Sequence, residues 1–87
     1  MTELLIKQVS FSDDAMTATF NEGSAVTVPL SQLQRLNAAS PQERSYWELI
    51  GGGEGVHWPK IDEDLSVENI LAAYSRSQRD KYAQASR

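Results

Sequence analysis

Three short segments near the start of the chain alternate between apolar and polar residues, and this pattern constrains the fold more than any other. In residues 4–11, the side chains of Leu5, Val9 and Phe11 share one face, which Lys7 interrupts. Residues 16–20 and 26–28 alternate in the same way. A period of two residues is typical of half-buried strands. Polar turn signals separate the segments, so the pattern predicts a three-stranded antiparallel meander.

Two helix-start signals follow Pro29, which ends the third strand because proline cannot donate a ladder hydrogen bond. The first is Ser31, predicted as an N-cap with Gln34 completing a capping box. The second is Ser40, with Pro41 at the first helical position. Both helices are expected to be short.

The second half of the chain predicts a hairpin. Residues 46–50 are rich in aromatic and branched side chains, as strands are, and residues 56–58 form the next strand. By alternation, Trp47 and Trp58 can point inward while His57 points outward. The glycine-rich residues 51–55 do not open into a helix, so a flexible hairpin loop is favoured over a phosphate cradle.

The last helix has the clearest signals. Ser66 is its expected N-cap, and Val67, Ile70, Leu71 and Tyr74 form an apolar stripe at helical spacing. Beyond Tyr74 the stripe fades, which predicts one domain over residues 1–75 and a polar, partly frayed tail over residues 76–87. The expected fold class is α+β, with a meander plus a hairpin and two or three short helices, the C-terminal helix being the longest.

Composition excludes several classes of function. The chain has 87 residues, which suffice for one domain, and a net charge of −4, which argues against non-specific binding to phosphate backbones. It has no cysteine, so disulfides, thiolate nucleophiles and cysteine-ligated zinc are excluded. That absence suits a reducing cytoplasm. We expect no signal peptide, no membrane span and no cofactor.

His57 and the acidic run after it form the first candidate site. With Asp62, Glu63 and Asp64, the imidazole is a candidate metal-ligand set or acid–base group. The structural alternative is favoured: carboxylates ahead of a helix stabilise its N-terminal end. Two tryptophans in a small domain are likewise more often core than ligand platforms. The candidate partner contacts are Trp47, His57, Trp58, Asp62, Glu63, Asp64 and Tyr74.

The basic residues near the C-terminus form the second candidate site. The rest of the chain is acidic, and this cluster of basic residues is a candidate for nucleic-acid contact. Asp80 interrupts them, and no DNA-binding motif accompanies them, so a solvated helix end is favoured. These residues are Arg76, Arg79, Lys81 and Arg87.

The junction from Trp47 to Val67 also carries a family likeness. Its tryptophan, glycine loop, Val56-His57-Trp58-Pro59 and Ile61-Asp62-Glu63-Asp64-Leu65-Ser66 resemble small bacterial proteins known as domain of unknown function twenty-four forty-two. The similarity reaches about Tyr74. It implies a small α+β domain without established catalytic activity, often resembling the antitoxin-like half of a two-gene unit.

The function expected from these observations is a non-catalytic protein-binding module, an antitoxin-like partner of a small neighbouring protein or of a second copy. The last helix or an exposed sheet edge would make the contact. The first alternative is a nucleic-acid-associated regulator that uses the basic tail. The second is a small metal-dependent hydrolase that uses His57 and the acidic turn.

Overall fold

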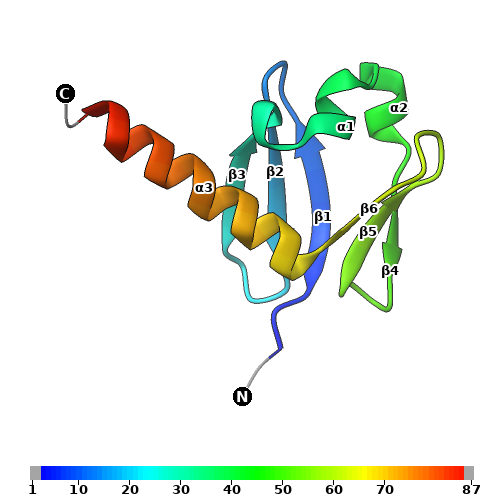
Figure 1. The fold of residues 1–87 in the computed structure, drawn as a ribbon. Helices are drawn as coiled ribbons and strands as arrows, with labels where there is room; N and C mark the ends of the chain where they lie inside the picture. The colour runs from blue at the N-terminus through cyan, green and yellow to red at the C-terminus, as the bar shows by residue number, and fades with distance from the viewer. Residues whose placement is uncertain (1–2, 86–87) are drawn as a thin grey trace.

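The computed structural model describes the backbone of residues 3–85 and the side chains of residues 3–81. Two three-stranded antiparallel sheets and a long C-terminal helix build the molecule (Figure 1). The predicted α+β class is confirmed, with the longest helix at the C-terminus. The elements in chain order are β1 (Ile6–Phe11), β2 (Ala15–Phe20), β3 (Ala25–Pro29), the 3-10 helix η1 (Leu30–Gln32), α1 (Gln34–Ala38), α2 (Pro41–Ser45), β4 (Glu48–Ile50), β5 (Gly55–Trp58), β6 (Glu63–Ser66) and α3 (Val67–Ala85).

The first sheet is the predicted meander, in the order β1-β2-β3. Alternate residues of β2, Met16, Ala18 and Phe20, are buried as the pattern required. The turn from β2 to β3 contains Gly23 at φ 101°, a conformation that costs glycine little.

The register of β1 differs from the prediction at its start. Ile6 lies opposite Phe20 but Gln8 lies opposite Thr19, so Lys7 is the extra residue of a β-bulge. The bulge places Ile6 and Val9 together on the buried face, although they are three residues apart. Assigning Leu5 to that face was therefore wrong: it precedes the strand and is only half-buried.

The second sheet, in the order β4-β5-β6, contains a strand that the sequence did not predict. The acidic run was expected to be a turn, but Glu63 and Asp64 belong to β6, which pairs with β5. The turn is confined to residues 59–62, and Asp62 within it has φ 52°. The fourth strand is also shorter than residues 46–50.

Of the two predicted N-caps of the short helices, Ser40 is confirmed and Ser31 is wrong. The hydroxyl of Ser40 accepts a hydrogen bond from the N–H of Glu43 and the carboxylate of Glu43 accepts one from the N–H of Ser40, a complete capping box. Ser31 was predicted to cap a helix, and that is wrong. Pro29 precedes η1 and Leu33 precedes α1, and neither supplies a side-chain cap.

Helix α3 joins the two sheets. It starts where β6 ends, with the Ser66 hydroxyl accepting a hydrogen bond from the N–H of Asn69, as predicted for the cap. It then crosses β3, and its C-terminal half extends beyond the first sheet (Figure 1). The helix continues through Ala85. Fraying of residues 76–87 remains a prediction. In residues 3–85, no helix combines the length and apolar character needed to cross a bilayer.

One core lies between the two sheets and α3. Ile70 and Ala73 of the helix are fully buried in it, together with Val56 and Trp58 of β5. Trp58 also meets the ring of Phe11 edge-on, with centroids 6.4 Å apart. Both sheets therefore share one apolar interior. The core cluster comprises Ile6, Val9, Met16, Ala18, Phe20, Val28, Leu30, Leu33, Leu36, Val56, Trp58, Leu65, Val67, Ile70 and Ala73.

Candidate functional site

Trp58 is a core residue. Its side chain is 0% exposed, and its indole N–H donates a hydrogen bond of 3.1 Å to the C=O of Arg44. The expectation that it points inward is confirmed. A partner has no Trp58 surface to touch, so its part in the site is to hold the C-terminal end of α2 against β5.

Trp47 and Tyr74 are half-buried and pack against the edge of the core. Trp47 keeps part of its indole exposed beside β1, whereas Tyr74 lies on α3. In the chain, Trp47 lies between α2 and β4, His57 lies in β5 and Tyr74 lies in α3, and their role as partner contacts remains a prediction.

His57 forms a cross-strand pair with Asp64 on the outer face of the second sheet. Its Nδ1 hydrogen-bonds the Asp64 carboxylate. This bond raises the pKa of His57; the charges of Asp64, Glu48 and Asp62 act in the same direction, and desolvation opposes them. The prediction that His57 points away from the core is confirmed, because the ring is partly exposed. The pair is a surface ion pair when the imidazole is protonated.

The acidic residues around His57 do not converge. Asp62 lies in the turn, where its backbone C=O faces the Arg35 guanidinium at 3.4 Å. The Glu63 carboxylate accepts a hydrogen bond from the N–H of Asp64. Within residues 3–81, no three His, Asp or Glu side chains are grouped as metal ligands.

The described basic residues Arg76, Arg79 and Lys81 lie in the C-terminal half of α3. The Nε–H of Arg76 donates to the side-chain oxygen of Gln32 in η1 at 3.2 Å, and the amide of Gln32 donates to Asp80 at 3.1 Å. Arg79 and Lys81 are exposed. Arg87 lies outside the described residues. A nucleic-acid role for these residues remains a prediction.

Sequence reasoning missed an exposed apolar edge, defined by Tyr46, Leu49 and Ile50 and called here the β4 edge. These are the exposed large hydrophobic residues among those described, at 58%, 39% and 42% exposure. The sequence marked the segment as strand, but alternation does not tell which edge of a sheet stays open.

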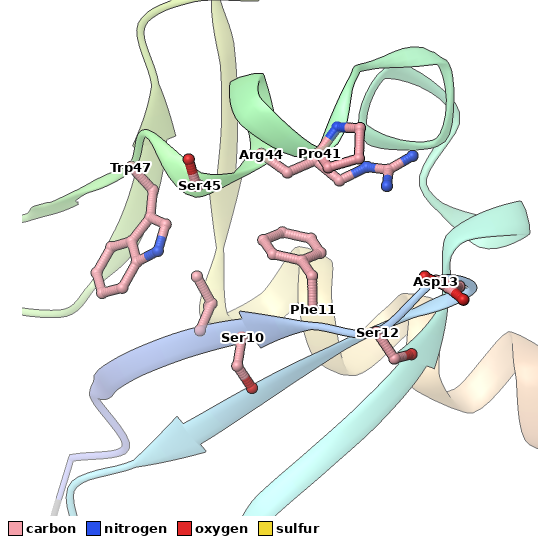
Figure 2. A pocket seen from close by; sticks show the side chains of 9 residues that line it. Ser10, Phe11, Ser12, Asp13, Pro41, Arg44, Ser45 and Trp47 are labelled. Carbon is pink, nitrogen blue, oxygen red and sulfur yellow. The ribbon is translucent and has the colours of Figure 1, made fainter.

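Sequence reasoning also missed a cleft of about 470 Å³, called here the β1 cleft. It opens between β1 and the segment from α2 to Trp47 (Figure 2). Phe11 rises from β1 toward α2, and Trp47 approaches from the other end. Its lining residues are Val9, Ser10, Phe11, Ser12, Asp13, Pro41, Arg44, Ser45 and Trp47.

The family model described as "Protein of unknown function (DUF2442)" matches residues 6–75. The chain belongs to this family. Its fold is also similar to the crystal structure of a protein of unknown function from Rhodospirillum rubrum, with 25% identity, a TM-score of 0.71, and coverage of 82% of this chain and 88% of that one. A search of curated proteins finds no match. The resemblance read from the Trp47–Val67 junction is thereby confirmed, and the family's printed description assigns no activity.

Proposed function

We propose that this DUF2442 chain is a non-catalytic, cytoplasmic protein-binding module whose partner adds a strand to the β4 edge. One observation carries the proposal: the exposed large hydrophobic residues of the described chain gather within five positions, Tyr46 to Ile50. Exposed apolar surface is a mark of interaction sites when the residues lie together, and these three lie in β4 and the segment that leads into it. An open strand edge beside it is a template for pairing with another chain.

The hydrogen-bond pattern shows which backbone groups the edge offers. The N–H of Val67 donates to the C=O of Glu54, so Glu54 and every second residue of β5 after it pair with β6. Gly55 and His57 therefore pair with β4, opposite Ile50 and Glu48. The N–H and C=O of Leu49 consequently point away from the sheet, available to an added strand.

The surroundings of His57 favour binding over catalysis. His57 lies between its cross-strand neighbours Glu48 of β4 and Asp64 of β6, on the outer face of the second sheet. Asp64 and Glu48 are exposed, so a reacting group there would stay hydrated. Charged residues flanking an apolar edge suit the rim of an interface. The proposed partner is a small protein, as in antitoxin-like pairs, or a second copy of the chain.

The test is co-purification of tagged protein from its native cell, comparing the wild type with Ile50→Lys. Thr27→Lys on the exposed face of β3 is the matched control, since it adds the same charge to a different strand. A stoichiometric partner should accompany the wild type and the control but not Ile50→Lys. If the partner is a second copy, Ile50→Lys should abolish a concentration-dependent dimer. A partner or dimer retained by Ile50→Lys would overturn the proposal.

A further inference from the structure

We propose that the β1 cleft is a second binding site, separate from the β4 edge, for an extended peptide segment that carries a basic side chain. The inference goes beyond the proposed function and does not depend on it. It stands on three features of the cleft: an open strand edge, an aromatic wall and an unpaired carboxylate.

The open edge belongs to β1. The N–H of Ser12 donates to the C=O of Ala15, so Ser12, and Ser10 before it, direct their backbone groups toward β2. Val9 and Phe11 therefore point their N–H and C=O groups away from β2, on the side where the cleft opens (Figure 2). Near its start, the same edge is occupied, because the N–H of Ile6 donates 2.8 Å to the C=O of Gly53. The open stretch thus coincides with the cleft.

The aromatic wall is formed by Phe11 and Trp47. Figure 2 shows the two rings facing the same space, with the indole nitrogen of Trp47 directed into it. Among the described residues, this N–H donates no hydrogen bond, and it is not a buried orphan, so it is available to a ligand carbonyl. An extended peptide supplies such carbonyls along its whole length. Side chains of an added strand opposite Val9 and Phe11 would lie on the same face as these residues and contact the rings.

Charge selects a basic side chain. Asp13 lines the far end of the cleft. Within residues 3–81, His57 and Asp64 form the ion pair that the structure contains, so the Asp13 carboxylate has no cationic partner there. Arg44 also lines the cleft, but its Nε and Nη2 donate to the C=O groups of Leu36 and Asn37 and hold it against α1. The chain carries a net charge of −4, which attracts a cationic partner.

Strand geometry orders the peptide. Residues on one face of a strand recur every second position. In an antiparallel peptide with apolar residues opposite Val9 and Phe11, the residue that lies beside Asp13 is therefore two positions before the one opposite Phe11. The matching probe is acetyl-Lys-Thr-Leu-Thr-Val-amide. Its reversal, acetyl-Val-Thr-Leu-Thr-Lys-amide, fits a parallel strand. The charge control is acetyl-Glu-Thr-Leu-Thr-Val-amide.

The experiment is a titration of isotope-labelled protein with each probe, followed by amide and indole resonances. We expect one lysine probe to shift the amides of Val9 and Phe11 and the indole N–H of Trp47 saturably, and the glutamate probe to shift them less. Asp13→Asn should weaken lysine-probe binding about two- to fivefold, as expected for an exposed ion pair. Glu3→Gln removes the same charge outside the cleft and should leave binding unchanged. Trp47→Phe, which keeps an aromatic ring but removes the N–H, should weaken binding.

Three results would overturn the inference. The first is no shift at these residues with either lysine probe up to about 1 mM, a concentration that half-fills even a weak site. The second is equal binding of the glutamate probe. The third is a response confined to Leu49 and Ile50, which would assign the peptide to the β4 edge. Ile50→Lys should bind the probe as the wild type does, which separates this site from the proposed function.

Discussion

Replacing Trp58 with phenylalanine tests whether the tryptophan junction is structural. The indole fills the space between β5 and Phe11 and is 0% exposed. Its N–H also donates to the C=O of Arg44, which is the last residue but one of α2. Phenylalanine keeps an aromatic ring but removes both the donor and part of the volume.

The expected loss in the free energy of unfolding has two parts. Leaving the C=O of Arg44 without its partner in a part-buried site costs about 1–3 kcal/mol. The space left by the smaller ring costs about 1 kcal/mol more. The total of about 2–4 kcal/mol is a large fraction of the ~5–15 kcal/mol that stabilises a typical domain.

Urea denaturation followed by far-ultraviolet circular dichroism measures this loss as a lower midpoint at unchanged slope. The control is Trp47→Phe, where the ring is half-buried and no hydrogen bond to another described residue is lost; its cost should stay below about 1 kcal/mol. If Trp58→Phe lies within about 0.5 kcal/mol of the wild type, the junction does not hold the fold in the way described here.

Three further substitutions test the second sheet and the loop between β4 and β5. Gly53→Ala should lower the free energy of unfolding by more than about 3 kcal/mol, because the added Cβ would lie 2.5 Å from the carbonyl oxygen of Ile6 and φ is 120°. Gly52→Ala, whose Cβ meets open space, should cost only about 1–2 kcal/mol. Equal urea midpoints for the two variants would refute this. For His57, the raised folded-state pKa means that the Asp64 pair stabilises the protein fully below the unfolded value of 6.5 and loses this effect as pH rises through the folded value. Asp64→Asn should therefore lower the urea midpoint more at about pH 5.5 than at about pH 9, and a pH-independent difference would contradict the assignment.

Local patterns predicted the parts of the fold that local interactions determine. The alternation of Met16, Ala18 and Phe20 and the capping residues Ser40 and Ser66 specify their own surroundings within a few positions. Each of these predictions is confirmed.

Long-range pairing decided what the sequence could not predict. Glu63 and Asp64 have low strand propensity and read as a turn, but β5 supplies a ladder that overrides it. The bulge at Lys7 similarly depends on the partner strand β2. For the candidate site, alternation correctly turned His57 outward and Trp58 inward. It carried no information on the open β4 edge or the β1 cleft, because both depend on which strands end a sheet.

The glycine-rich composition of residues 51–54 is typical of a loop that tolerates an inserted tag or linker. The contacts of this loop make it a poor site for an insertion. Gly53 is buried, and its C=O accepts the hydrogen bond from the N–H of Ile6. A protein engineer who lengthens this loop would therefore disturb the start of β1. The amide proton of Ile6 should exchange with solvent deuterium only when its hydrogen bond to the C=O of Gly53 breaks. The exchange rate of this one proton therefore reports whether β1 and the loop between β4 and β5 stay joined.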